Sequence, residues 1–389
     1  MKHRILQLSL SYAPNWKDGG PPRIMYDLAK NLIRLGHEVL VITSEQNKVN
    51  DYKKVCEEIN IFYVKSTNFF RKYYFNHSFF QLINILLKNK NQYDFLHLPQ
   101  TRSIFNLCAL LMQVFFKKRI ILSAFGSAPL RNKTLLRKLY DYLFLRPILV
   151  SKKNIFLAQT GNEEDEYVSL GVNRNQIHML PLAVDSSESS EISLEDLIKF
   201  KKKHGIDDVN INFTFLGRLH PTKNVLNLIK AFSKLVSLFP SIRLFVVGDD
   251  QGSYHECINY VKENNLEDFF TFTGPIYANE RWKMYLSSSC YVISPRVSEE
   301  TPLAAIEALS CSTPVITNKL ASIPDLDLFK AGFECEDYKE ESIRAKIKDF
   351  LALPQTEKES MSKNALNLFN ARFKIDSVTR KLVSILDHS

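Results

Sequence analysis

The hydrophobic pattern of the first 45 residues predicts a strand, a loop, a helix and a second strand. The apolar run RILQLSL comes first, and the loop SYAPNWKDGGPP follows it. Apolar residues then recur at the spacing of one helix face, at Met25, Leu28, Leu32 and Leu35. Gly36 is placed to end that helix, and HEVLVIT resumes as a β-branched strand. Such a β-α-β unit implies a parallel sheet with a right-handed crossover.

The second half of the chain repeats this alternation. Strands are predicted at 211–217, 241–248, 268–274 and 290–295, with helical patterns after the first two. A polar stretch rich in serine and glutamate, 185–196, suits a linker. We therefore predict an α/β protein with two Rossmann-like, doubly wound parallel-sheet domains. The expected domains are 1–185 and 186–369, and the last helix, about 370–389, is expected to pack back on the first.

Length and composition agree with two globular domains. The chain has 389 residues, of which 45% are hydrophobic and 24% charged. Six cysteines are present without a C-x-x-C pair, so we expect reduced thiols and no zinc site. The N-terminus lacks the pattern of a signal peptide. The longest apolar run, 105–116, is shorter than the roughly 20 residues that span a bilayer. We therefore expect a cytoplasmic protein.

The positive charge is concentrated in two N-terminal segments. The net charge is +9, which suits nucleic acid, an anionic membrane or anionic small ligands. Residues 117–153 carry ten Lys or Arg and one acid, and 65–90 mix five cations with seven aromatics. We expect peripheral attachment to the inner face of the cell membrane. Ordinary helices with their aromatics turned inward remain the alternative. No recognition motif for nucleic acid is present.

The stretch SEETPLAAIEALSCSTPVI (298–316) is the most informative one. Thr301 is placed to cap a helix that starts at Pro302, after a predicted strand. Ligands of open α/β sheets bind beyond the carboxyl ends of strands, and the N–H groups up to Leu303 suit a phosphate. Glu299 would lie in the loop and Glu307 in the helix. The alternative interpretation is that the acidic residues of this loop only stabilise the N-terminus of the helix through its dipole.

Two further loops carry candidate binding residues. In FLGRLHPTKNVL, Arg218 follows a strand and Lys223 precedes a helix, which suits a diphosphate. A solvated basic loop is the alternative. In KDGGPP, Gly19 and Gly20 allow a ligand to approach the backbone before a helix. No G-x-G-x-x-G is present, which argues against a nicotinamide or flavin dehydrogenase.

These motifs, in this order, resemble the GT-B glycosyltransferases, specifically the large retaining family four (glycosyl transferases group 1). The two glutamates separated by seven residues, the G-R-x-x-x-x-K of the 217–223 loop and the Gly-Gly pair are similar to motifs of that family. LGHEV (35–39), VVGDD (246–250), FTG (272–274) and LGVNRNQIHMLPLAVD (170–185) match further family segments. The resemblance covers most of the chain and implies that the two domains face a central cleft.

The resemblance also implies roles for the candidate residues. Arg218 and Lys223 would bind the donor diphosphate and stabilise the charge of the leaving group. Glu299 would bind the sugar hydroxyls, and Glu307 would bind the ribose. Further donor contacts are implied at Gly19, Gly20, Gly217, Gly274, Thr301, Pro302 and Leu303. The donor would be a UDP- or GDP-linked sugar, with no metal or other cofactor. The acceptor would be a carbohydrate or a lipid-linked one, in cell-surface polysaccharide or lipopolysaccharide assembly.

The chain departs from the family pattern at three places. The usual E-G-F-G is Glu299-Glu300-Thr301-Pro302, which changes the expected phosphate contacts. P-N-G-V-D is replaced by PLAVD (181–185), and the frequent His-Gly of the acceptor side by Phe125-Gly126. His97, near a strand end, would contact acceptor or sugar, unless it is a structural histidine. A non-catalytic binding protein of this fold and a sugar-nucleotide epimerase remain alternatives to the transferase.

Overall fold

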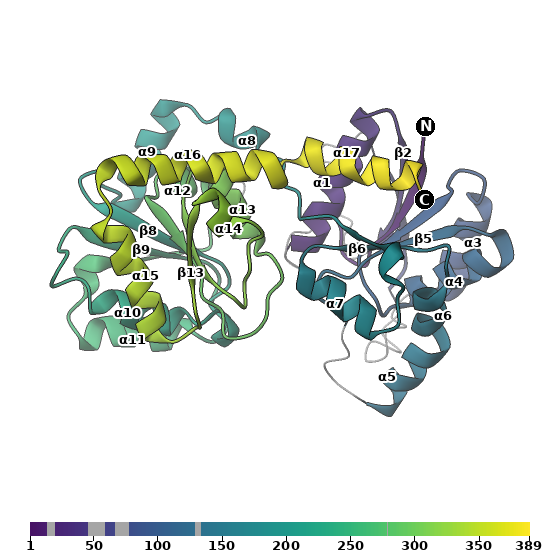
Figure 1. Ribbon diagram of the computed structural model, residues 1–389, viewed down its shortest axis with the longest axis horizontal. Helices are drawn as coiled ribbons and strands as arrows, with labels where there is room; N and C mark the ends of the chain where they lie inside the picture. The colour runs from purple at the N-terminus through teal and green to yellow at the C-terminus, as the bar shows by residue number, and fades with distance from the viewer. Residues whose placement is uncertain (14–19, 46–58, 67–77, 129–133, 278) are drawn as a thin grey trace. The chain divides into compact units, whose positions relative to one another are not determined.

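The chain forms two compact units (Figure 1). The computed structural model describes residues 1–13, 20–45, 59–66, 78–128, 134–277 and 279–389. The first unit consists of Met1–Ala183 together with Ile375–Ser389, and the second of Val184–Lys374. The two points where the chain passes between the units had been predicted at 185 and about 370. The first unit is therefore completed by the last helix of the chain.

The first unit is built on a seven-stranded parallel sheet with the order β3-β2-β1-β4-β5-β6-β7. Its strands are β1 (Arg4–Leu8), β2 (Glu38–Ser44), β3 (Asn60–Val64), β4 (Phe95–Leu98), β5 (Arg119–Ser123), β6 (Ile155–Ala158) and β7 (Ile177–Met179). Ile5 of the central strand pairs with Val39 on one side and Phe95 on the other. Strand order therefore reverses direction between β1 and β4, as in a doubly wound sheet.

Alternate residues of these strands enter two cores, one on each face of the sheet. Ile5 belongs to the core beneath the first and last helices, whereas Leu6 and Leu8 belong to the core on the opposite face. The helices are α1 (Gly20–Arg34), α3 (Phe79–Lys88), α4 (Ile104–Phe116), α5 (Leu135–Tyr140), the π-helix η4 (Asp141–Leu145), α6 (Arg146–Val150), α7 (Gly161–Ser169), the 3-10 turn η5 (Arg174–Gln176) and α17 (Ile375–Asp387).

The last helix packs against the first. Figure 1 shows α17 beside α1, and the Asn31 side chain donates to the Ile375 carbonyl at 3.3 Å. His3 Nε2 lies 3.0 Å from Asp387 at the other end of α17. Helix α17 has one apolar face, formed by Ile375, Val378, Leu382 and Leu386, and this face is buried. Without α17 that side of the core would be open to solvent.

The second unit repeats the architecture with six parallel strands in the order β10-β9-β8-β11-β12-β13. Its strands are β8 (Ile211–Leu216), β9 (Ile242–Val247), β10 (Phe270–Gly274), β11 (Cys290–Val292), β12 (Val315–Asn318) and β13 (Gly332–Cys335). The central strand β8 again lies between the next strand in sequence and a later one. Both sheets are therefore parallel and doubly wound, as predicted for two Rossmann-like domains.

Helices of the second unit alternate with its strands. They are α8 (Ser187–Ser190), α9 (Leu194–His204), α10 (Val225–Ser233), α11 (Tyr254–Glu263), α12 (Asn279–Leu286), α13 (Leu303–Ser310), α14 (Leu326–Phe329), α15 (Glu340–Ala352) and α16 (Gln355–Arg372), with 3-10 turns η6 (Pro221–Lys223) and η7 (Glu267–Phe269). The Val184 amide donates to the Phe373 carbonyl at 3.0 Å. The two chain segments that enter and leave the second unit are thus hydrogen-bonded side by side.

Five of the six cysteines lie in described residues, and all five are buried and free. Burial raises the pKa of the Cys108 and Cys257 thiols to about 12, so these thiols stay protonated near neutral pH. Cys56 lies outside the described residues. Within the described ranges, no helix combines the length and the apolar character needed to cross a membrane.

Candidate active site

The candidate site of the second unit lies where its strand order reverses. Strand β8 pairs with β9 on one side and with β11 on the other. The loops that leave β8 and β11 therefore start side by side at the carboxyl edge of the sheet. Doubly wound sheets bind ligands at such switch points, because the helices that follow the two strands diverge to opposite faces.

These two loops bring Lys223 and Glu299 together. Lys223 Nζ donates to Glu299 Oε2 at 2.6 Å, and the two side chains are 16% and 20% exposed. The turn before Lys223 is held locally, because the Thr222 amide donates to His220 Nδ1 at 3.2 Å. The next residue, Asn224, has a left-handed backbone with φ of 61°. The result is a partly solvated ion pair at the mouth of the switch point.

Hydrogen bonds tie the two loops to each other and to neighbouring loops of the same unit. The side-chain Nδ2 of Asn224 donates to the carbonyls of Ser294 at 3.0 Å and Tyr338 at 2.7 Å. The Arg296 amide donates to the Thr222 carbonyl at 2.8 Å, and the Glu299 amide to the Leu320 carbonyl at 2.6 Å. Both ends of the ion pair are therefore carried by a hydrogen-bonded frame, which is the condition for a preorganised site.

Glu307 is held by protein groups in the interior. Its two carboxylate oxygens accept from Arg281 Nε at 3.2 Å and from the Tyr285 hydroxyl at 3.1 Å. The carboxylate is only 6% exposed. Burial and the Glu307 charge together raise the pKa of Tyr285 well above its ordinary value. A buried carboxylate with these partners is stable as a structural ion pair, and a ribose contact remains an expectation from family resemblance.

A buried tyrosine lies near both glutamates. Burial raises the pKa of Tyr291, and the charges of Glu299 and Glu307 raise it further. Its hydroxyl donates to the Leu216 carbonyl at 3.1 Å, one residue before Gly217. Tyr291 therefore links the end of β8 to the region of the two carboxylates.

Arg218, in the same loop as Lys223, has a partner of its own. It is exposed, and its Nη1 donates to Gln251 at 3.2 Å. The preceding Gly217 lies against Gly248, which has φ of +151° and where an added Cβ would be 1.8 Å from the Gly217 carbonyl oxygen. Gly274 also has a positive φ, 71°. The close approach at Gly248 lets the ends of β8 and β9 lie next to each other.

The helix after Glu299 begins later than predicted. Helix α13 starts at Leu303, and Pro302 precedes it with an extended ψ of 123°. Thr301 does not cap the helix: its hydroxyl oxygen is buried and has no hydrogen-bond partner among the described residues. The expected Thr301 cap was therefore wrong, because a residue before proline is pushed away from the geometry that leads into a helix.

The start of α13 presents polar groups that are available to a ligand. Within the described part of the chain, no acceptor is recorded for the backbone amides of Leu303 and Ala304. The buried Thr301 hydroxyl adds a third unfilled polar group beside them. Unfilled amides at a helix N-terminus favour an anion, because the helix dipole adds to their hydrogen-bonding capacity.

The first-unit candidates lie on and beside strand β4. His97 is fully buried, and its Nε2 lies 2.8 Å from the Ser123 hydroxyl. Its Nδ1 has no partner among the described residues, and burial lowers the His97 pKa to about 3. Phe125 and Gly126 have φ of 47° and 72°, and the Gly126 amide donates to Glu163 at 2.9 Å. Gly20 is the first residue of α1. Gly19 lies outside the described residues.

Two sequence profiles match this chain. The profile of glycosyl transferases group 1 matches residues 197–368, and that of Glycosyltransferase Family 4 matches residues 18–188. The chain belongs to glycosyltransferase family 4. Its two units with parallel sheets have the GT-B fold of that family.

Curated relatives of this family 4 member are glycosyltransferases. It is 28% identical over 171 residues to a D-inositol 3-phosphate glycosyltransferase of Pseudarthrobacter chlorophenolicus. It is 22% identical over 379 residues to a component of the phosphatidylinositol N-acetylglucosaminyltransferase of Arabidopsis thaliana. These alignments cover 43% and 95% of this chain, and 40% and 79% of the relatives. The chain thus spans less than half the length of the first relative.

Solved structures show the same fold at low identity. A glycosyltransferase from Rickettsia africae has a TM-score of 0.79 at 17% identity, and 100% of each chain is covered. Anabaena HepE in complex with UDP and glucose has a TM-score of 0.73 at 16% identity, and 99% of each chain is covered. At this identity the likeness establishes the fold of the family 4 chain.

Three residues of the candidate site were not predicted from sequence. Asn224 follows Lys223 directly, and an Asn at the start of an apolar helix pattern is a signal that could have found it. Tyr291 lies inside an apolar strand, and its hydroxyl group was the one polar feature there that could have drawn attention to it. Arg281 gave no local signal, because its partner Glu307 is 26 residues away.

Proposed function

We propose that this family 4 protein moves a sugar from a nucleotide-sugar donor to a carbohydrate or lipid-linked acceptor. The setting we propose is cell-surface polysaccharide or lipopolysaccharide assembly. The observation that supports the transfer best is the Lys223–Glu299 pair of 2.6 Å at the switch point, next to the unfilled amides of α13. A cation, a carboxylate and an anion-binding helix start are the groups that a sugar diphosphate requires.

Each group has a proposed task. Cleavage of the bond between sugar and diphosphate leaves negative charge on the diphosphate. Lys223 and the N-terminus of α13 stabilise this charge, and Arg218 reaches it from its exposed position. Glu299 accepts hydrogen bonds from the sugar hydroxyls and orients the Lys223 ammonium group. We propose retention of the anomeric configuration and assign no protein nucleophile. No metal is required in this proposal, because the cations and amides supply the positive charge.

A thermal-shift panel tests the donor part of the proposal. We expect UDP or GDP to raise the melting temperature of the second unit, and ADP to have less effect. Anabaena HepE was solved in complex with UDP, and its shared fold favours UDP as the first nucleotide to test. Ligand at 100 times its Kd adds about 2.7 kcal/mol, which is a shift of several degrees. If none of the three nucleotides shifts the melting temperature at millimolar concentration, the proposed donor site is contradicted.

The membrane part of the proposal concerns an exposed apolar stripe on α5 and η4. The stripe consists of Leu135, Leu136, Leu139, Tyr142 and Leu143, which recur at i, i+1, i+4, i+7 and i+8. Their exposed fractions run from 46% to 82%. Side chains at this spacing share one helix face. Exposed apolar patches of this kind mark interaction surfaces. In the other basic segment, 65–90, which was also expected to contact the membrane, residues 67–77 lie outside the described residues.

The charges beside the stripe favour an anionic lipid surface. Lys138 and Arg146 are exposed next to it, and Arg137 is half-buried. The nearby acid, Asp141, is paired with Arg102 at 2.8 Å, so it does not face a lipid headgroup as a free charge. Cations beside exposed leucines combine the two attractions that hold an amphipathic helix at a membrane.

Vesicle flotation tests this surface. We expect binding to vesicles of phosphatidylglycerol and phosphatidylcholine at low salt, and its loss in a Leu139→Glu, Leu143→Glu double variant. Leu238→Glu is the matched control, because Leu238 is equally apolar, 65% exposed and lies in the second unit. Equal flotation of the double variant and the control would contradict the assignment of the stripe.

A further inference from the structure

Two buried asparagines flank the start of the segment that leads from β11 to Glu299. Strand β11 lies between β8 and β12 in the sheet, so the loops that leave β8 and β12 lie on either side of the loop that leaves β11. Asn224 follows Lys223 in the loop after β8, and Asn318 is the last residue of β12. The two asparagines are 6% and 0% exposed. The segment 294–295, just beyond β11, is therefore held from both sides.

Each asparagine uses both N–H groups of its side-chain amide. Asn224 Nδ2 donates to the Ser294 carbonyl at 3.0 Å and to the Tyr338 carbonyl at 2.7 Å. Asn318 Nδ2 donates to the Ser294 hydroxyl at 2.9 Å and to the Pro295 carbonyl at 2.9 Å. An asparagine side chain has no further N–H group to offer a ligand. The two amides therefore hold the segment after β11 and do not bind a ligand directly.

These hydrogen bonds extend to both members of the ion pair. Asn224 is bonded covalently to Lys223, so its side chain fixes the backbone from which the ammonium group projects. On the other side, Asn318 Oδ1 accepts from the Leu320 amide at 3.0 Å, and the Leu320 carbonyl accepts from the Glu299 amide at 2.6 Å. One asparagine thus fixes the backbone at Lys223 and the other the backbone at Glu299, and both do so relative to the same segment.

The ion pair does not fix this geometry by itself. The Lys223 and Glu299 side chains are 16% and 20% exposed and have several rotatable bonds, so their attraction is weakened by water and by the entropy lost in holding them. Hydrogen bonds of buried amides are stronger, because no water competes for the same groups. Asn224 adds a second constraint, since its φ of 61° is left-handed. Its side chain and its backbone conformation are separable contributions, because glycine keeps the second and lacks the first.

We propose that Asn224 and Asn318 are positioning residues of the donor site, which set the separation of Lys223 and Glu299 for a nucleoside diphosphate. This inference rests on the proposed function, because it takes the ion pair to be the diphosphate site. Neither asparagine touches the ligand, and each acts through the residue whose backbone it holds. Loss of either side-chain amide therefore weakens binding of the diphosphate and leaves binding of the base and ribose unchanged.

Titration of the full chain with UDP and with uridine tests the inference, and GDP and guanosine take their place if guanine is the base that binds. Asn224→Gly keeps the left-handed backbone and removes both side-chain hydrogen bonds. We expect this variant to bind UDP about tenfold more weakly, and uridine within about twofold of the unaltered protein. When Lys223→Ala is already present, Asn224→Gly should change the UDP affinity by less than about twofold, because the cation that it positions is absent.

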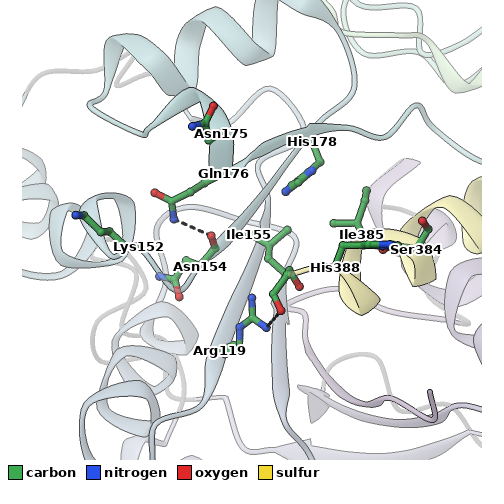
Figure 2. A pocket seen from close by; sticks show the side chains of 11 residues that line it. Arg119, Lys152, Asn154, Ile155, Asn175, Gln176, His178, Ser384, Ile385 and His388 are labelled. Atoms are coloured by element: carbon green, nitrogen blue, oxygen red, sulfur yellow. Dashed lines mark hydrogen bonds between the residues drawn. The ribbon is translucent and has the colours of Figure 1, made fainter.

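The matched controls are buried asparagines at the amino-terminal edges of the two sheets. Asn212, the second residue of β8, donates to the Asp207 carbonyl at 2.9 Å. Asn154 precedes β6 in the first unit, and its side chain donates to the Ile148 carbonyl at 2.8 Å. Figure 2 shows Asn154 beside Gln176, whose Nε2 donates to the Asn154 carbonyl at 2.9 Å. Asn212→Ala and Asn154→Ala should lower the free energy of unfolding in urea and leave the UDP affinity unchanged.

The outcomes separate this inference from the proposed function. Equal UDP affinity in Asn224→Gly, or a loss for uridine as large as that for UDP, overturns the inference and leaves the donor site in place. An undiminished effect of Asn224→Gly in the absence of Lys223 overturns it as well. If neither UDP nor GDP binds to the unaltered protein, the proposed function fails and the inference fails with it. Should Asn224→Gly not fold, Asn318→Ser is measured in its place, and the same results decide.

Discussion

Replacement of Lys223 by alanine is expected to abolish measurable sugar transfer while the second unit stays folded. Lys223 Nζ is 2.6 Å from Glu299 and belongs to the proposed diphosphate site. Removal of one preorganised charge that acts on a developing anion costs about 10²–10³-fold in rate. The variant also leaves Glu299 without its cation, so the carboxylate would repel the diphosphate. We therefore expect the loss to lie at or above the upper end of that range.

The measurement is release of nucleoside diphosphate, with and without acceptor. Lys202→Ala is the control, because Lys202 is an exposed lysine of the same unit outside the site. Glu299→Gln should also lose transfer, since an amide no longer orients the ammonium group. Full activity of Lys223→Ala would refute the site. Donor consumption by the unaltered protein that needs no acceptor would point instead to an epimerase.

Acidification below pH 6.5 is expected to destabilise the first unit through His97. Its pKa is about 3 in the folded chain, against about 6.5 in an unfolded one. Between these values the unfolded state binds more protons, so stability is complete above pH 6.5 and falls as the pH decreases toward 3. The contribution is on the order of 4–5 kcal/mol over the whole interval, because each unit of pKa difference corresponds to about 1.4 kcal/mol.

The physical cause is the burial of the ring. His97 Nδ1 has no partner among the described residues, so a proton added there finds no acceptor to offset desolvation. Urea unfolding of the first unit at a series of pH values measures the effect. In His97→Gln the free energy of unfolding should fall less steeply between pH 6.5 and 4. In His255→Gln, at an exposed histidine, its dependence on pH should be that of the unaltered protein. Parallel slopes for all three proteins would show that His97 does not titrate this way.

Much of the fold could be predicted because its signals are local. The helical spacing of Met25, Leu28 and Leu32 and the strand-like runs around them depend only on neighbouring residues. The structure has α1 at Gly20–Arg34 and β2 at Glu38–Ser44, as this pattern indicates. The helix after Glu299 was predicted for the same reason. Its first residue was not, because the effect of Pro302 on Thr301 competes with the preference of threonine for a cap.

The candidate site depended on contacts that no local pattern contains. Lys223 and Glu299 are 76 residues apart in sequence, and they meet because β8 and β11 are neighbours in the sheet. Glu307 has the helical position that was predicted, yet its partners Arg281 and Tyr285 come from another helix. The sequence alone thus determined which elements form and in what order, since those preferences act within a few residues. Tertiary structure decided which loops adjoin and which charges pair, because burial and strand order act between residues far apart in the chain.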